Sequence, residues 1–192
     1  MSGPVQPTAR DVLDFWFGDA DEPRQAWFRK DPAFDDSIRS RFGALIESAL
    51  AGTLDGWAAS PDGALARLLV LDQFTRNVFR GTARAFAGDA QALAGARAMV
   101  AHGDDLHLPP LRRVFAYLPF EHSEDSAMQR ESVRLFEALA AQRPDLAGYV
   151  DYAHRHAEVI ERFGRFPHRN AALGRASGAD EAAWLALPGS GF

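Results

Sequence analysis

Residues 31–50, DPAFDDSIRSRFGALIESAL, contain both the start signal and the apolar pattern of a helix. Asp31 followed by Pro32 is typical of an N-cap and a first helical position, where the missing N–H of Pro costs no hydrogen bond. Apolar side chains then recur at helical intervals on one face: Phe34, Ile38, Phe42, Leu45 and Ala49. Gly52 follows as a stop signal. The stretch therefore predicts an amphipathic helix that packs on a helical core.

The same kinds of signal divide the rest of the chain into helices. Ala, the best helix former, occurs 35 times, whereas the strand-favouring Val, Ile and Thr together occur 16 times. No run of strand length alternates between apolar and polar residues. Capping residues and Gly or Pro breakers then predict further helices at about residues 9–17, 61–80, 89–102, 110–118, 124–143, 145–163 and 180–187.

The predicted fold is all-α, with eight to nine helices in a tetratricopeptide-like stack of α-hairpins or an orthogonal bundle. A chain of 192 residues suits a single domain, which we expect over residues 1–187, with a C-terminal tail at 188–192. Helix pairs recur at about the 34-residue length of a tetratricopeptide unit, but the Trp, Gly, Tyr and Pro pattern of that repeat is missing.

The composition excludes several kinds of protein. The formal net charge is −5, whereas a nucleic-acid binder is usually basic. The chain has no Cys, which excludes disulfide scaffolds, Cys-ligated zinc and thiol catalysis. No segment reaches the ~20 apolar residues of a membrane helix, and residues 1–10 lack the apolar core of a signal peptide. We expect a cytoplasmic protein that binds neither nucleic acid nor membrane and carries no metal or cofactor.

Nearly all of the basic charge is Arg, with 20 Arg against a single Lys, Lys30. A genome rich in G and C accounts for most of this bias. Some of the Arg side chains can nevertheless serve as planar forks for carboxylate or phosphate, which Lys cannot do. Their positions in three unusual stretches decide between the two interpretations.

The first stretch, LDQFTRNVFRG at residues 71–81, brings polar groups into a largely apolar helix. Asp72, Arg76 and Arg80 recur at four-residue steps on one face, beside a second row formed by Gln73 and Asn77. Asp72 would hold Arg76 in one rotamer and leave its other donors for a ligand. A buried ion pair that orients adjacent helices explains the same residues equally well, because buried charges are normally paired.

The second stretch, YLPFEHSED at residues 117–125, crowds acidic residues and a His at a helix start. Ser123 and the two acids after it are explained as an N-cap and a first turn. His122 lies at the corner, where a neighbouring Glu121 or Asp125 would favour its charged form and tune it as an acid or base. A corner His bonded to the backbone is the alternative.

The third stretch, HRHAEVIERFGRFPHRNAALGR at residues 154–175, combines a helix end with a new turn. Pro167 pushes Phe166 out of the helical region and starts the turn that carries His168, Arg169 and Asn170. The free N–H groups of such a first turn favour anions. Four Arg interleaved with Phe favour an anion pocket over a solvated face: Arg162, Arg165, Arg169 and Arg175.

Together the three stretches resemble the family catalogued as domain of unknown function 924. Its pattern is similar to Leu71–Asn77 with Arg80 and Gly81, to Leu118–Asp125, to Phe163–Asn170 with Leu173–Arg175, and near the N-terminus to Phe15–Gly18 and Trp27-Phe28. Thr75 stands where the family pattern has Pro, and Ser177-Gly178 where it has Ser-Thr. The resemblance implies a tetratricopeptide-like all-α fold and brings no accepted activity, so it leaves the function open.

The first functional hypothesis is a pocket for a small anionic ligand, with acid–base hydrolysis or transfer as the reaction class if the protein is an enzyme. The predicted catalytic residues are His122, His168 and Asp72. The predicted ligand-binding residues are Gln73, Arg76, Asn77, Arg80, Glu121, Asp125, His154, Arg162, Arg165, Arg169, Asn170 and Arg175. The sequence does not decide whether the protein is an enzyme.

Two alternatives stay open at this point. A tetratricopeptide-like interaction module would bind an acidic peptide or protein partner in an Arg-lined groove, without catalysis. A metal site would draw its ligands from a larger set: His122, His154, His156 and His168 with Glu121, Glu124 and Glu158. The spacing of these residues matches no standard metal motif, so we predict no metal ligands.

Overall fold

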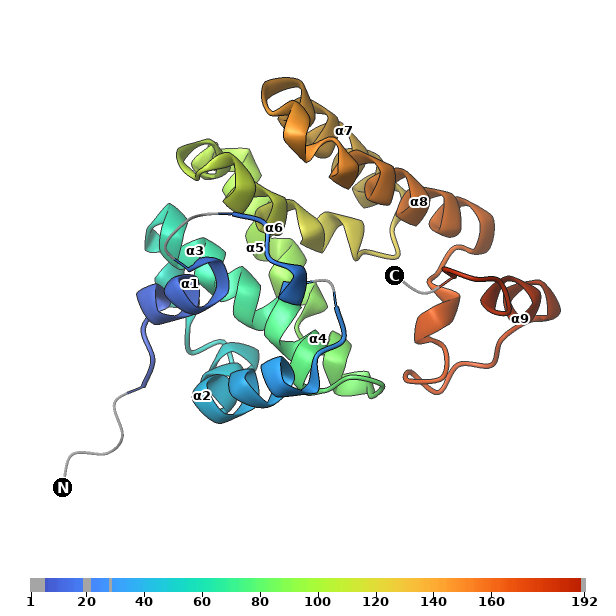
Figure 1. The fold of residues 1–192 in the computed structure, drawn as a ribbon, viewed down its shortest axis with the longest axis horizontal. Coiled ribbons are helices and arrows are strands. Elements are labelled where there is room, and N and C mark those ends of the chain that lie inside the picture. Colours follow the sequence, from blue (N-terminus) through green and yellow to red (C-terminus); the bar gives the residue numbers. More distant parts are fainter. Residues whose placement is uncertain (1–5, 19–21, 28, 191–192) are drawn as a thin grey trace. The chain divides into compact units, whose positions relative to one another are not determined.

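The computed structural model describes residues 6–18, 22–27 and 29–190, and all regular structure in these ranges is helical. This confirms the predicted all-α fold. None of the helices in the described ranges is both long and apolar enough to cross a membrane. The α-helices, labelled in Figure 1, are α1 (Ala9–Phe17), α2 (Pro32–Leu50), α3 (Pro61–Leu68), α4 (Thr75–Val78), α5 (Asp89–His102), α6 (Pro110–Glu121), α7 (Ser126–Gln142), α8 (Gly148–Phe163) and α9 (Ala179–Leu185).

Contacts within the chain divide it into two compact units. The first unit takes the described residues up to Arg80 together with Arg84–Pro119. The second takes Gly81–Ala83 and the described residues from Phe120 onward. Each unit is described below by itself, and a single domain over residues 1–187 stays a prediction.

The helix predicted from residues 31–50 forms as α2 and contributes to the core of the first unit. The Asp31 carboxylate caps it by accepting the N–H groups of Ala33 (2.9 Å) and Phe34 (3.2 Å). The predicted apolar face is buried at Ile38, Phe42, Leu45 and Ala49, and half-buried at Phe34. The ring of Phe42 packs against Phe15 of α1 and against Phe74, with centroids 5.1 and 5.0 Å away.

The helix predicted over residues 61–80 is interrupted by a wider turn. Ser60 caps α3 as expected, but Leu69–Phe74 form a buried π-helix before α4 begins. Such segments are rare and often occur at functional sites. The Thr75 hydroxyl donates to the Leu71 carbonyl (2.7 Å), a bond that Pro at this position could not make. Apolar periodicity did not predict the π segment because all six of its residues are buried, so no exposed face marks it.

The break predicted near Pro119 does not occur, and α6 continues to Glu121. The buried Gln129 amide of α7 stabilises this helix end by donating to the carbonyls of Glu121 (2.7 Å), the last residue of α6, and of Ser123 (2.6 Å), just past it. The N-cap of α7 is Asp125 rather than Ser123, because its carboxylate accepts two N–H groups of the first turn.

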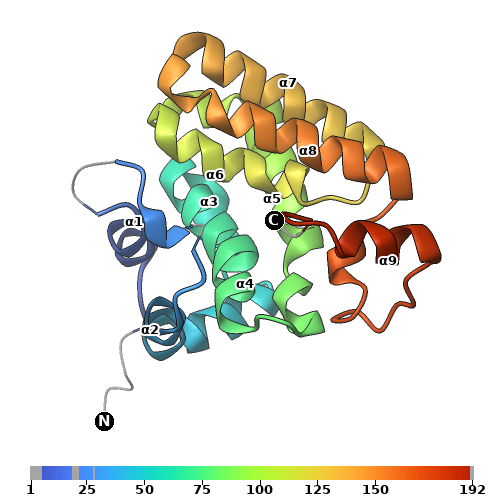
Figure 2. The same ribbon diagram turned by 45° about the vertical axis from the view of Figure 1, so that its right-hand side comes forward.

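Within the second unit, α7 and α8 form a helical hairpin and lie side by side in Figures 1 and 2. Val159 and Ile160 of α8 form a buried cluster with Phe166, which follows the helix end. Phe163 and Trp184 pack against this cluster, with their ring centroids 5.7 Å apart. Trp184 thus anchors α9 to the end of α8.

Part of the predicted C-terminal tail contacts this unit. The Ser190 hydroxyl donates to the Leu185 carbonyl (3.0 Å), and Arg155 of α8 donates to the Gly189 carbonyl (3.1 Å). Residues 191–192 of the tail, like Phe28 of the N-terminal pattern, lie outside the described residues.

Candidate functional site

The first polar stretch lies in the first unit, where Arg76 is held by two carboxylates. Its guanidinium lies 2.9 Å from Asp72 and binds Asp89 with two hydrogen bonds of 2.8 and 3.0 Å. Gln73 donates its amide to the other oxygen of Asp72 (2.6 Å). Burial opposes the charge on Arg76, but the carboxylates of Asp72 and Asp89 outweigh it and raise the pKa of the guanidinium.

Arg80 and Asn77 share a third carboxylate, Asp35 of α2. Arg80 donates two hydrogen bonds to it (2.7 and 3.0 Å), and the Asn77 amide donates one (2.7 Å). Asp35 was not among the residues predicted from the sequence. A signal for it exists, because Asp35 lies three residues before Ile38 and so falls on the apolar face of α2, where an acid needs a buried partner.

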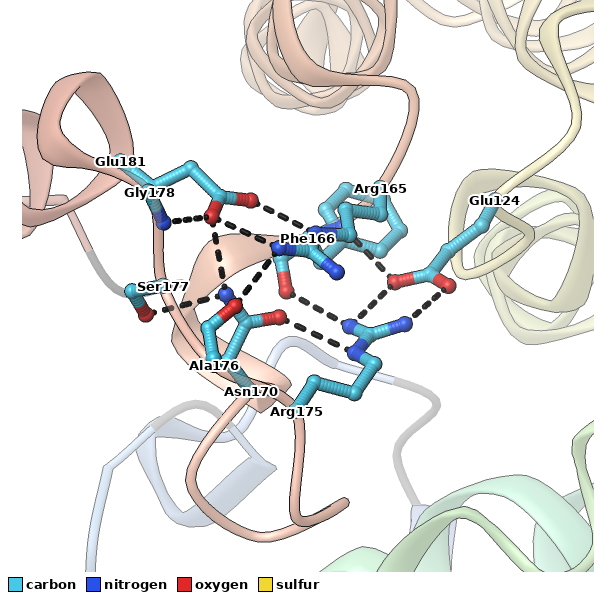
Figure 3. A network of polar contacts seen from close by, with 9 residues as sticks. All are labelled: Glu124, Arg165, Phe166, Asn170, Arg175, Ala176, Ser177, Gly178 and Glu181. Carbon is cyan, nitrogen blue, oxygen red and sulfur yellow. Dashed lines mark hydrogen bonds and ion pairs between the residues drawn. The ribbon is translucent and has the colours of Figure 1, made fainter.

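The third stretch forms a polar network in the second unit, shown in Figure 3. Arg165 binds the Glu181 carboxylate of α9 with two hydrogen bonds of 2.7 and 2.8 Å. Arg175 binds the Glu124 carboxylate, from the connection between α6 and α7, with two hydrogen bonds of 2.7 and 2.9 Å. Both arginines predicted to hold a ligand are therefore engaged by carboxylates of their own unit.

Asn170 joins the two ion pairs into one network. Its carbonyl oxygen accepts from Arg175 (3.0 Å), while its amide donates to Ser177 (3.0 Å) and to Glu181 (3.3 Å). The hydrogen bond from Arg165 and that from the Gly178 N–H lower the pKa of Glu181 to about 2. Burial raises the pKa of Glu124, but Arg175 and the Phe166 N–H outweigh it and hold that pKa below its usual value.

Four cationic or titratable side chains gather beside this network, three of them around the buried ring of Phe166 and the fourth next to His156. The ring centroids of His156 and His168 lie 5.6 and 5.4 Å from that of Phe166. The Arg169 guanidinium stacks over the same ring at 4.5 Å and donates to the backbone carbonyl of His122 (2.9 Å). The His122 ring in turn lies 6.3 Å from that of His156. We call His122, His156, His168 and Arg169 the histidine cluster.

His156 is the buried member of the histidine cluster. Its Nδ1 lies 2.8 Å from the Tyr152 carbonyl, which can only accept, so Nδ1 carries the proton in the neutral ring. The Glu121 carboxylate lies 3.2 Å from the same atom and favours the charged form. Burial and the positive charges of His122, His168 and Arg169 act in the opposite direction and lower the pKa of His156 to about 3.

The structure therefore brings together four of the predicted residues: Glu121, His122, His168 and Arg169. His122 and His168 are half-buried, so solvent reaches them, whereas Glu121 and Arg169 are buried. From the sequence, His156 was a candidate only as a metal ligand. The signal that could have singled it out is its position three residues before Val159 and four before Ile160, on the buried face of α8.

The other predicted residues lie outside the histidine cluster. Asp72 belongs to the first unit, whereas His122 and His168 belong to the second. Asp125 caps α7, and His154 is exposed on α8, 3.5 Å from Glu137. Arg162 is exposed, stacks on Phe163 and lines an open depression with Arg165 and four residues at the start of α9, Gly178–Glu181.

The metal alternative gains no support from the described part of the chain. There, no group of three or more His, Asp or Glu side chains is arranged to hold a metal ion. His154, one of the proposed ligands, lies on the exposed face of α8, while His156 lies on the buried face.

Comparison with other proteins bears on the family and the fold. Residues 12–189 match the model of a family described as bacterial proteins of unknown function, DUF924. The chain is 39% identical to an Agrobacterium tumefaciens protein of unknown function whose structure is solved, with a TM-score of 0.84. That similarity covers 93% of this chain and 96% of the other. The comparison with curated proteins gives no match.

Proposed function

We propose that the second unit of this chain, which belongs to the DUF924 family of bacterial proteins, binds a small anion, a phosphate or a carboxylate, at the histidine cluster. The observation that carries the proposal is that His168 and Arg169 meet on one buried ring, Phe166, while Arg169 also binds the backbone carbonyl of His122. Each of the three is close enough to His156 for its charge to lower the pKa of that residue.

The chemistry of these side chains supports an anionic ligand. A guanidinium keeps its charge at any physiological pH, and an imidazole gains charge when an anion binds beside it. Half-buried donors also form stronger charge-assisted hydrogen bonds than exposed ones, since less water competes for the ligand. His122 and His168 would contact the ligand, and Arg169 would supply fixed positive charge behind them.

An acid–base step is the finer part of the proposal. His122 or His168 would exchange a proton with the bound ligand, because an imidazole titrates near neutral pH. His156, buried beside Glu121 and kept neutral by its surroundings, would hold the neighbouring rings in place. Hydrolysis or transfer of an anionic ester is the reaction class that these groups favour. A cytoplasmic location belongs to the same proposal.

The test uses inorganic phosphate as the probe. At about twentyfold its Kd, phosphate should stabilise the protein by about 1.8 kcal/mol, which corresponds to about 3–7 °C in Tm. His122→Gln and His168→Gln should each remove most of this shift, whereas His154→Gln, on the exposed face of α8, should keep it. NMR titration of the imidazole signals should show His122 and His168 moving first.

Equal phosphate stabilisation of all three variants and the wild type would refute the site. Binding of an acidic peptide that His168→Gln does not weaken would refute it too, in favour of the interaction-module alternative.

A further inference from the structure

The segment that carries His168 and Arg169 is held through its backbone at Phe166, the residue that precedes its turn. Gly164 and Gly174, both in the left-handed region (φ +70° and +67°), bound this part of the chain with sharp turns. Between them, Pro167–Arg169 form only one turn of 3₁₀-helix. So short a turn has too few internal hydrogen bonds to fix its own orientation.

Glu124 and Arg175 supply the missing constraint by binding both peptide groups of Phe166. One Glu124 oxygen accepts the Phe166 N–H (2.7 Å), and Arg175 donates to the Phe166 carbonyl (3.1 Å). The two side chains also bind each other through two hydrogen bonds. Figure 3 shows this closed ring of contacts. The backbone of Phe166 is thereby fixed to the connection between α6 and α7, where His122 lies.

We infer that Glu124 and Arg175 are positioning residues, which orient Phe166 and thereby place His168 and Arg169 against His122. The inference rests on the proposed function, since it concerns the geometry of the same anion site. Neither side chain needs to touch the ligand. Their effect on the ligand passes through the Phe166 ring, which contacts His168 and Arg169 directly.

The geometry also explains why residue 175 is Arg. Its Nε, Nη1 and Nη2 atoms donate to four acceptors on three residues: Asn170, both oxygens of Glu124, and the Phe166 carbonyl. The ammonium of Lys carries the same charge, but its three donors lie on one nitrogen atom, so it cannot reach all of these acceptors at once. Arg175→Lys therefore removes the geometry and leaves the charge.

Arg143→Lys is the matched control. Arg143 also binds a carboxylate with two hydrogen bonds, to Asp145 (2.9 and 2.7 Å), and lies in the same unit. The pair of Arg143 with Asp145 is exposed, and within the described residues it shares no hydrogen bond with Phe166 or Asn170. A general effect of exchanging Arg for Lys would appear in both variants, whereas a positioning effect would appear only at Arg175.

The experiment measures the free protein and phosphate binding separately. In the free protein, Arg175→Lys and Glu124→Gln should shift the His168 and His122 ring signals and their NMR-measured pKa values, and accelerate hydrogen exchange at the Phe166 amide. Phosphate affinity, measured by calorimetry, should fall about tenfold in both variants. In Arg143→Lys it should stay within about twofold of the wild-type affinity. Circular dichroism confirms that each variant is folded.

The possible outcomes separate the two proposals. Unchanged histidine signals and unchanged exchange at Phe166 in Arg175→Lys would overturn the positioning role, whatever happens to phosphate. If the wild type does not bind phosphate, the proposed function fails, and the free-protein signals still decide the positioning role. Should Arg175→Lys not fold, Glu124→Gln gives the same readout, because it keeps the size of the side chain but loses the charge and one of the two acceptor oxygens that bind Arg175 and Phe166.

Discussion

The buried His156 should make the protein lose stability on mild acidification. In the folded state burial, His122, His168 and Arg169 lower its pKa to about 3, whereas in the unfolded chain an imidazole has a pKa of 6.5. Above that value both states are neutral and His156 contributes no pH dependence. As the pH falls below it, the unfolded state takes up the proton and the folded state does not, so stability is lost until the folded pKa is reached.

The size of the effect follows from the two pKa values. At about pH 5 the unfolded state gains a factor of about 30 from protonation, which lowers the free energy of unfolding by about 2 kcal/mol relative to about pH 8. The full loss, near the folded pKa, is on the order of 5 kcal/mol. Measurements at about pH 5 and above avoid most of the titration of carboxylates such as Glu124 and Glu181.

Urea unfolding at a series of pH values, followed by circular dichroism, measures this loss. His156→Asn keeps an N–H near the position of Nδ1 but cannot titrate, so its stability should fall less between about pH 8 and about pH 5, by about 2 kcal/mol. His154→Gln, an exposed His on the same helix, should follow the wild type. If Glu121 instead dominates and raises the pKa of His156, the wild type would lose no more stability than His156→Asn, and the argument from burial would be wrong.

Three further predictions concern the polar networks and the π segment. Asn170→Asp should lower the free energy of unfolding by about 2–3 kcal/mol, because it places a second carboxylate against that of Glu181. Ser177→Ala, which removes one hydrogen bond to Asn170, should lower it by less than about 1 kcal/mol. Denaturant melts of the two variants measure both values. Arg76→Lys should cost about 2 kcal/mol, since it loses the two-pronged bond to Asp89, while Arg10→Lys, in an exposed pair with Asp14, should change stability by less than about 0.5 kcal/mol. Gly88→Ala should lower the free energy of unfolding by more than about 3 kcal/mol, because its Cβ would lie 2.2 Å from the Leu71 carbonyl oxygen. A Cβ at Gly43 in α2 meets nothing within 4 Å, so Gly43→Ala should stabilise the protein by about 0.5–1 kcal/mol. Equal effects of the two changes in thermal melts would contradict the packing at the π segment.

The helix starts were predictable because capping is local. Thr8 and Asp11 are three residues apart, and their reciprocal hydrogen bonds form as their spacing indicates. The partners of the buried charges were not predictable in this way. Asp35 binds an Arg 45 residues later in the chain, so only the fold brings the two together.

The π segment and the continuation of α6 past Pro119 were missed for a related reason. Each depends on a side-chain hydrogen bond to a backbone carbonyl, which local helix propensity does not predict. Thr75 donates a hydrogen bond to the Leu71 carbonyl at the end of the wide turn, and Gln129 of α7 donates to carbonyls at and just past the end of α6. A pattern of apolar residues reports which face is buried, but it does not report which side chain will satisfy a backbone carbonyl.

The excess of Arg over Lys gains a specific meaning from these contacts. Four arginines that the sequence assigned to a ligand use the fork geometry on carboxylates of their own unit: Arg76, Arg80, Arg165 and Arg175. An anion would have to displace those carboxylates, at the cost of leaving a partly buried acid unpaired. Arg169 donates to the backbone carbonyl of His122 and stacks on Phe166, so its guanidinium lies within the histidine cluster. The planar geometry of Arg therefore builds the scaffold at these four positions, and the half-buried His122 and His168 are the side chains that we propose contact the anion.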